Sequence, residues 1–359
     1  MIRGLPVSYA LAFAGFAALI ILHELGHFAA AKAVGMRVER FALFFPPLIA
    51  KVRRGETEYG IGAIPLGGYV KITGMNPGEE LTPEVARRAY YNQPVWKRIV
   101  VISAGPAVNI LLAFVILWAV FLSRGELGSP ASVAQVERGK PAAAVLKPGD
   151  QILAVDGRAP AGDGVDKQMD WIGKAIAGHH GTPVSLTIKR DGATTTVQAM
   201  PFNDKKLKKW RIGFSQEPTV HDVGPGHAAT ASLSGMWSVT SETVSKIAQI
   251  FKPEERKQLG SVVGGYEATR QALSYSTTDA LILLAVISLS LGVVNLFPFL
   301  PLDGGHIFWA LAEKVRGKAI PFAVMERAGM IGFALVIGLF VIGFTNDLGR
   351  LTGDGFGVR

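Results

Sequence analysis

The chain has 359 residues, of which 49% are hydrophobic and 18% charged, and it contains no cysteine. Soluble domains usually have about 25% charged residues, so this composition argues against an ordinary soluble protein, and it excludes disulfides and thiolate metal sites. The net charge of +9 does not indicate a nucleic-acid partner, because aromatic and basic residues are not interleaved, and basic residues beside apolar runs more often set membrane topology.

The first apolar run, from Gly4 to Leu22, contains no charged residue. It is longer than the apolar core of a usual signal peptide, and it leads into a His-Glu motif instead of a small-residue cleavage site. We therefore expect a retained transmembrane helix that continues to about Val34.

Three further runs lack charged residues over about 18 positions or more, the length needed to cross ~30 Å of hydrocarbon. They are Ile99 to Leu122, Ala280 to Leu302 and Ala328 to Thr345. Four such runs favour membrane spans over the buried core helices of a soluble protein. The expected fold class is a mainly α polytopic membrane protein with four transmembrane helices in contact with membrane lipids.

Lysine and arginine are abundant in the connection between the first and second runs, and they recur between the third and fourth. The positive-inside rule therefore predicts that both connections are cytoplasmic. Residues 123–279 and both termini are then expected outside.

The first connection contains an unusually apolar patch, Ile61 to Ile72, in which Pro65 and the pair Gly67-Gly68 interrupt alternating residues. This pattern predicts two short strands joined by a turn. The patch is too apolar for an ordinary cytoplasmic hairpin, so we expect a membrane-reentrant β-hairpin beside the metal, where protein or a water-filled cavity can receive it. A surface hairpin is the alternative.

The outside segment is expected to hold a compact α+β domain at residues 125–203. Strands are predicted at Ser132–Val136, Gln151–Val155, Val184–Arg190 and Thr194–Ala199, the last two joined by the turn Asp191-Gly192. The stretch from Lys140 to Gly157, with its Lys-Pro-Gly-Asp-Gln-Ile-Leu-Ala-Val-Asp-Gly, resembles the core of a bacterial PDZ domain. Such a domain can bind an extended peptide at a sheet edge, or it can restrict access without binding one.

The remaining outside residues, 204–279, are expected to form a connector. Ser232 to Phe251 has the pattern of an amphipathic helix that lies on the membrane surface. Residues 1–124 and 280–359 then form the N-terminal and C-terminal membrane parts.

The residues that carry chemistry begin where the first apolar run ends. His23 and His27 are four apart and share one face of a helix, so both imidazoles can reach one metal ion. Glu24, next to His23, is placed to take a proton from an attacking water. This pattern predicts a zinc hydrolase centre, with Glu24 as general base and then proton donor to the leaving group.

A catalytic zinc commonly has three protein ligands, so a third is needed from elsewhere. Asp303 follows the third apolar run and precedes Gly304-Gly305. A carboxylate at the end of a membrane span is costly unless it is paired or bound to a metal. His306 is the rival ligand, but it lies nearer the cytoplasmic connection, and we expect Asp303.

Two asparagines lie close to these motifs in the sequence. Asn295 is a candidate to hold the substrate backbone or the oxyanion by hydrogen bonds; stabilising a broken helix end is the alternative. Asn109, which follows Gly105-Pro106, is expected to be a polar helix-packing residue.

Together these pieces resemble the site-2 protease family of intramembrane zinc metalloproteases, peptidase type M50B. The shared motifs are the His23-to-His27 motif, the Gly67-Gly68-Tyr69 hairpin and the segment from Asn295 through Pro298 to Asp303-Gly304-Gly305. With the interposed PDZ domain, the match is to the bacterial RseP-like branch and spans nearly the whole chain.

The resemblance implies that His23, His27 and Asp303 bind Zn²⁺, that Glu24 is catalytic, and that Gly67, Gly68 and Tyr69 present the substrate as an added strand. It also implies a bacterial inner-membrane protein with an extracytoplasmic PDZ domain and an active site near the cytoplasmic face. Expected substrates are single-pass membrane proteins, either anti-sigma factors already cut on their outer side or signal-peptide remnants.

The chain departs from the branch in two ways. It has one PDZ domain where some members have two, and it has Ser261 where Gly-Pro is usual. A different class of function also stays open, a PDZ-bearing membrane scaffold with a structural metal site, although such a site has no need of Glu24.

Overall fold

The computed structural model describes residues 5–76, 78–162, 164–205, 207–250, 252–256 and 259–353. The chain divides into two compact units, one of residues 1–120 and 229–359 and the other of residues 121–228. We describe each by itself. Phe251, the expected last residue of the amphipathic helix, lies outside the described residues.

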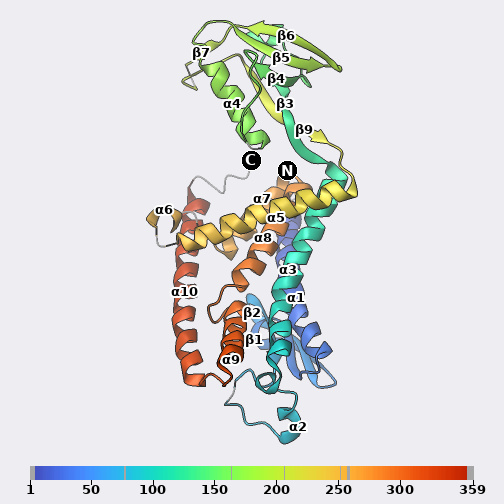
Figure 1. The fold of residues 1–359 in the computed structure, drawn as a ribbon, viewed down its shortest axis with the longest axis vertical. Coiled ribbons are helices and arrows are strands. Elements are labelled where there is room, and N and C mark those ends of the chain that lie inside the picture. The colour runs from blue at the N-terminus through green and yellow to red at the C-terminus, as the bar shows by residue number, and fades with distance from the viewer. Residues whose placement is uncertain are drawn as a thin grey trace. The chain divides into compact units, whose positions relative to one another are not determined.

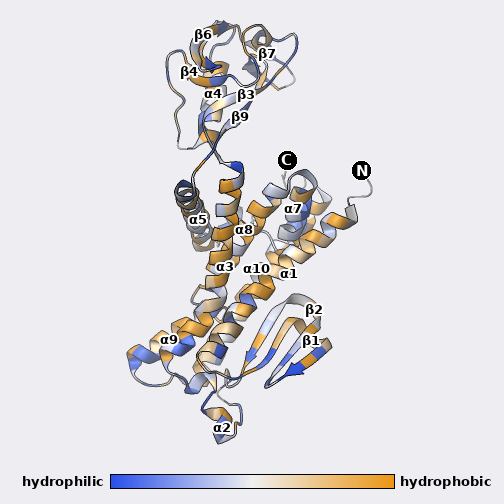
Figure 2. Ribbon diagram, turned by 90° about the vertical axis from the view of Figure 1, so that its right-hand side faces the viewer, coloured by the Kyte–Doolittle hydropathy of each residue, from blue (hydrophilic) through white to orange (hydrophobic). Residues whose placement is uncertain are grey.

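The first unit is built on long helices (Figure 1). Within the described residues, four helices are long and apolar enough to cross a membrane: α1 (Leu5–Ala33), α3 (Val95–Arg124), α8 (Thr277–Asn295) and α10 (Phe322–Thr352). Hydrophobic residues cover most of the length of α3 (Figure 2). The four predicted spans are therefore confirmed.

The third span is shorter than the sequence indicated. The uncharged run continues to Leu302, but α8 ends at Asn295. Pro298 and Pro301 lack the N–H that a helix needs and restrict the residues before them. The segment between Leu296 and Leu302 is therefore a loop, and α9 (Asp303–Arg316) begins immediately after it.

Further helical segments belong mainly to this unit. They are α2 (Pro83–Ala86), the 3₁₀ turn η1 (Tyr90–Asn92), α5 (Pro225–Ala248), α6 (Pro253–Arg256) and α7 (Val262–Tyr275). The expected amphipathic helix corresponds to α5, which begins earlier in the chain than predicted and exposes Leu233 and Trp237.

The first connection forms two long strands, β1 (Val38–Arg54) and β2 (Thr57–Ile72), instead of one short hairpin around Pro65. Residues 40–43 of β1 pair on one side with residues 58–61 of β2 and on the other side with residues 68–71. The two predicted strands flanking Pro65 therefore do not pair with each other, because β1 lies between them. Residues 68–71 form an edge of this curled sheet.

The base of the β1–β2 sheet packs on the helices. A buried cluster joins the end of α1, the start of β1, the end of β2 and the start of α3, and it contains Ala31, Met36, Val38, Ile72, Tyr90, Val101 and Ile102. Beyond this base the sheet carries large apolar side chains that are exposed, namely Phe45, Ile49, Val52, Ile61 and Ile64.

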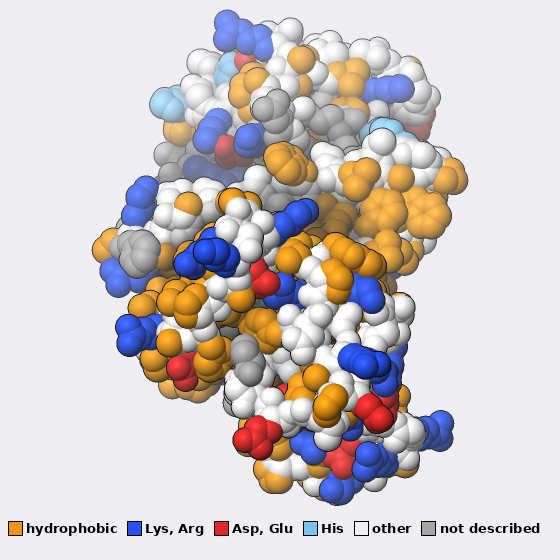
Figure 3. Space-filling view, turned by 60° about the horizontal axis from the view of Figure 1, so that its bottom comes forward, with side chains coloured by type: hydrophobic (Ala, Val, Ile, Leu, Met, Phe, Trp, Pro, Cys, Tyr) orange, Lys and Arg blue, Asp and Glu red, His pale blue; other side chains and the backbone are white. Residues whose placement is uncertain are grey.

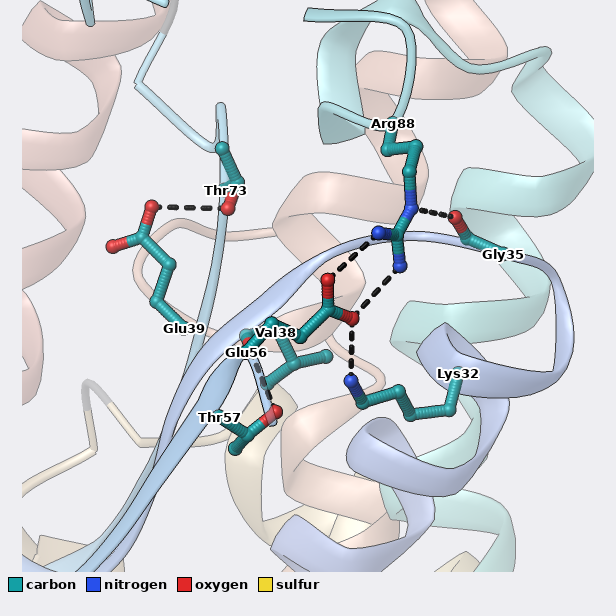
Figure 4. Close-up of polar contacts among 8 residues, drawn as sticks. All are labelled: Lys32, Gly35, Val38, Glu39, Glu56, Thr57, Thr73 and Arg88. Carbon is teal, nitrogen blue, oxygen red and sulfur yellow. Dashed lines mark hydrogen bonds and ion pairs between the residues drawn. The ribbon is translucent and has the colours of Figure 1, made fainter. Parts of the chain in front are cut away.

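Ion pairs also hold the base of the β1–β2 sheet. Glu56 accepts hydrogen bonds from Lys32 at 2.6 Å and from Arg88 at 2.7 and 2.8 Å, which joins α1, the β1–β2 turn and the segment after α2 (Figure 4). The Arg88 guanidinium and the Lys32 ammonium hold the pKa of Glu56 well below its usual value, at about 2.

The second unit contains a five-stranded antiparallel sheet in the order β6-β5-β4-β3-β9. The strands are β3 (Glu126–Val136), β4 (Gln151–Val155), β5 (Val184–Arg190), β6 (Ala193–Ala199) and β9 (Phe214–His221). The 3₁₀ turn η2 (Pro141–Ala144), helix α4 (Val165–Ala177) and the small pair β7 (Phe202–Asp204) and β8 (Lys209–Arg211) complete the unit.

The four predicted strands are present as β3, β4, β5 and β6, with β3 beginning earlier in the chain than predicted. Alternate residues of β5, namely Val184, Leu186 and Ile188, are fully buried in one core with Ile152 and with Ile172 of α4, as period-two patterning requires. The fifth strand, β9, comes from residues that the sequence assigned to the connector beyond 203, and it pairs with β3.

Candidate metal centre and active site

Three side chains converge where α1 meets the start of α9. His23 Nε2 and His27 Nε2 lie 3.3 Å apart, and Asp303 Oδ2 lies 3.3 Å from the first and 3.2 Å from the second. This His-His-Asp group has its ligand atoms within 4.8 Å of one another. The structure thus brings together the three ligands that the sequence predicts. His306, the rival, is not in this group.

The geometry fits zinc. Ligands at about 2.0–2.2 Å from a tetrahedral ion are about 3.3–3.6 Å apart, and the three separations of 3.3, 3.3 and 3.2 Å lie at or just below the short end of this range. Asp303 Oδ2 is buried and has no hydrogen-bond partner among the described residues, so an uncompensated carboxylate oxygen faces the point that an ion would occupy. Both histidines are less than 9% exposed.

The orientation of His27 is fixed from α3. Its Nδ1 donates a hydrogen bond to the Val101 carbonyl at 2.9 Å. The proton therefore resides on Nδ1, and the lone pair of Nε2 points to the metal position, as in metal-bound histidines generally.

Glycines allow α1 and α3 to approach at this point. A Cβ on Gly105 would lie 2.3 Å from His27 Nε2, and a Cβ on Gly26 would lie 2.5 Å from the Ala104 carbonyl oxygen. Sequence reasoning did not identify Gly26, Val101 or Gly105 as parts of the site. In the sequence Gly105 stands out only as the neighbour of Pro106. A glycine next to a proline inside a helix was the one signal that could have indicated a close approach at this point.

Asp303 is positioned by a tightly folded loop. It is the first residue of α9, and Cβ atoms on Gly304 and Gly305 would collide with the Leu296 carbonyl and the Leu300 amide at 2.2 and 2.5 Å. These glycines are needed for this close approach, and neither has a positive φ. The loop before Asp303 therefore packs onto the first turn of α9.

Glu24 lies between the metal ligands and the edge of the β1–β2 sheet. A Cβ on Gly68 would be 2.8 Å from Glu24 Cγ. The edge residues 68–71 therefore run directly past the carboxylate. Tyr69 is held there by stacking on Phe45, with ring centroids 5.9 Å apart.

The two asparagines occupy different places. Asn295 is the half-buried last residue of α8, and its role in substrate binding stays a prediction. Asn109 is fully buried in α3, and its main-chain carbonyl accepts a hydrogen bond from Ser288 Oγ of α8 at 2.9 Å. The buried side-chain Nδ2 and Oδ1 of Asn109 make no hydrogen bond among the described residues, so a packing role for its polar side chain stays a prediction.

Apolar helices that converge on a His-His-Asp group with a glutamate beside it define an integral-membrane metallohydrolase. More specifically, the chain belongs to peptidase family M50, which matches residues 11–339. It is similar to zinc metalloprotease Rip1 of Mycobacterium tuberculosis, with 30% identity over 92% of this chain and 94% of that one. It is also similar to CPE1693 of Clostridium perfringens, which bears the name of a zinc metalloprotease, with 33% identity over 94% and 97% of the two chains.

Among solved structures, the chain is similar to the PDZ domain of the SdrC-like protein Lmo2051 from Listeria monocytogenes. The identity is 26%, the match covers 24% of this chain and 85% of that one, and the TM-score is 0.20. The family match and these relatives make the protein a zinc metalloprotease of the site-2 type and a multi-pass membrane protein. This assignment favours an enzyme over a scaffold with a structural metal.

Proposed function

We propose that the protein cleaves single-pass membrane proteins within or beside their transmembrane segment. The observation that carries this proposal is the position of Glu24 between two features: the three ligand atoms of His23, His27 and Asp303, and the open edge of β2. In this proposal the three ligands hold zinc, which when bound polarises the scissile carbonyl and lowers the pKa of a water. Glu24 takes the proton from the attacking water and then gives it to the leaving amine.

The β1–β2 sheet gives the substrate a place to lie. Residues 68–71 pair only with β1 within the described part of the chain, so their outer edge is open to an added strand. A transmembrane helix must unwind before it can be cut, and an edge strand stabilises the extended form. The exposed apolar side chains of Phe45, Ile49 and Ile64 support a sheet that enters the membrane.

The proposed orientation places the first connection and α9 on the cytoplasmic side. Lys, Arg, Asp and Glu side chains gather on the end of the first unit that carries α2 (Figure 3), and basic residues predominate in this connection. The protein then lies in the inner membrane of a bacterium, and its PDZ domain is extracytoplasmic. In this position the domain binds a substrate tail or restricts access to the metal centre.

We infer two substrate classes, an anti-sigma factor already cut on its outer side and signal-peptide remnants. They are tested by comparing the membrane proteomes of cells that express the wild type or Glu24→Gln. Membrane stubs that accumulate and co-purify with Glu24→Gln, but not with the exposed-site control Glu80→Gln, identify the substrates. Identical proteomes in all three strains would contradict the proposal.

A further inference from the structure

A cavity of about 410 Å³ adjoins the edge residues of β2 that follow Gly68. It is lined by Tyr69, Val70, Lys71, Ile72, Met75, Asn76 and Glu79. Successive side chains of a strand point to opposite faces of a sheet. A cavity that touches four consecutive strand residues therefore lies along the edge of the strand, where an added strand would run.

The cavity begins at the catalytic carboxylate. Tyr69, one of its lining residues, follows Gly68, where a Cβ would lie 2.8 Å from Glu24 Cγ. From Tyr69 the edge continues to Ile72, three residues or about 10 Å further along a strand. The cavity thus extends from beside the cleaved bond to a distance of a few residues.

The charged groups around the cavity are already paired with one another. Lys71 Nζ lies 2.7 Å from Glu39 and 3.6 Å from Glu79, and Glu79 also accepts a hydrogen bond from the Gly74 N–H at 2.8 Å. Glu39 in turn accepts a hydrogen bond from Thr73 Oγ1 at 2.9 Å (Figure 4). A charged substrate side chain would have to displace these partners, whereas an apolar one would not.

The apolar part of the wall is fixed on one side and adaptable on the other. The Tyr69 ring is held by its stacking on Phe45 and by a hydrogen bond from Arg40 Nη1 to its hydroxyl at 2.9 Å. Met75 is half-buried against the cluster at the base of the sheet. Because methionine is unbranched and has three rotatable bonds, it can adjust to side chains of different shape.

We propose that this cavity is a specificity subsite that receives an apolar side chain of the substrate, two to four residues from the cleaved bond. The substrate main chain extends along residues 68–72 as an added strand, and Met75 sets the size of side chain that the subsite accepts. This inference rests on the proposed function and adds the substrate feature that the site selects.

The test uses the purified full-length, zinc-loaded protein in lipid nanodiscs and a reporter with one transmembrane segment. Gly, Ala, Leu and Phe are placed in turn at each of the four positions on either side of the mapped cleavage site. The measured quantity is the ratio of kcat/KM for the Leu and Gly reporters, compared among the wild type, Met75→Trp and Met75→Ala. A ratio is unaffected by a uniform loss of active enzyme.

The wild type is expected to prefer Leu to Gly at one position, on one side of the bond, by about tenfold, a usual value for an apolar pocket. Met75→Trp should reduce this ratio to about one, and Met75→Ala should move the optimum from Leu to Phe. Met330→Trp, an exposed position on α10, should keep the wild-type profile.

The subsite proposal would be overturned if Met75→Trp kept the wild-type ratio of kcat/KM for the Leu and Gly reporters. An equal fall of kcat/KM for all reporters gives that same unchanged ratio and would overturn it too. If the wild type binds zinc but cleaves none of the reporters, the proposed function fails and the subsite fails with it. That result differs from the other two, in which the wild type cleaves.

Discussion

Gly105 of α3 leaves the space that the imidazole of His27 occupies, because a Cβ at position 105 would lie 2.3 Å from His27 Nε2. One helix therefore shapes the metal site carried by another, and it does so through the absence of a side chain. The same helix orients the imidazole, four residues earlier, through the Val101 carbonyl.

Gly105→Ala is predicted to weaken zinc binding by about 10- to 100-fold, the usual effect of disturbing the groups that orient a ligand. The methyl group must displace His27 from its position. Zinc content after equilibration with a chelator measures the effect. Gly338→Ala on α10 is the control, since a Cβ there meets nothing within 4 Å among the described residues. Equal zinc retention by both variants would show that His27 does not depend on Gly105.

Arg98 and Glu313 join α3 to α9. The guanidinium donates two hydrogen bonds to the carboxylate at 2.9 and 2.8 Å, and the Arg98 side chain is only 3% exposed. Glu313→Gln leaves a buried cation without its partner, so we predict a loss of up to about 3 kcal/mol in the free energy of unfolding.

The double variant Arg98→Met/Glu313→Leu should recover most of that stability, since it buries no charge. Thermal unfolding in detergent measures both variants. Asp170→Asn, which breaks the exposed pair with Lys174, is the control and should have little effect. Full stability of Glu313→Gln would mean that this pair does not hold α9.

Stability should depend on pH through Glu56. Its pKa is lowered to about 2 by Arg88 and Lys32, so the folded state favours the ionised carboxylate. This contribution is fully present well above the usual pKa of about 4.5, and it is lost as the pH falls toward 2. The difference in Tm between the wild type and Glu56→Gln should therefore be largest above pH 6 and shrink below pH 4. Glu84→Gln, at an exposed position, is the control; a constant Glu56→Gln difference from pH 3 to pH 7 would refute the linkage.

Ser261, a departure from the related branch, caps α7. Its Oγ accepts a hydrogen bond from the Val263 N–H and donates one to Asp347 Oδ2 at 2.7 Å. The fully buried Asp347 carboxylate also accepts from the N–H groups of Ser261 and Gly264. Ser261→Ala should cost about 1 kcal/mol of stability. Asp347→Asn should cost more, because buried donors lose a charged acceptor. Unfolding measurements in which Asp347→Asn matches the wild type would contradict this role.

The sequence predicted what is local in the chain. Four residues separate His23 from His27, and helix geometry alone places them on one face. Asp303 was found because a carboxylate at the end of an apolar run needs a partner. The uncharged run extends to Leu302, whereas α8 ends at Asn295, because Pro298 and Pro301 break the helix.

Non-local relations were not predictable from one sequence. The contact of Gly105 with His27 joins residues 78 positions apart, and glycine has no side chain whose pattern could indicate a partner. The strand order of the β1–β2 sheet depends on pairing between distant residues, so the sequence showed an apolar patch around Pro65 but not that residues 68–71 form its edge. The pairing of β9 with β3 was missed for the same reason.

The most direct measurement of the central claim is the cleavage of a transmembrane reporter by zinc-loaded Glu24→Gln. Glutamine has nearly the same shape but cannot take up a proton, so the variant should retain one zinc per chain and the wild-type Tm while its kcat falls by at least about 10³-fold. His23→Ala should instead lose the zinc. Substantial cleavage by zinc-loaded Glu24→Gln would contradict the assignment of Glu24 as the general base.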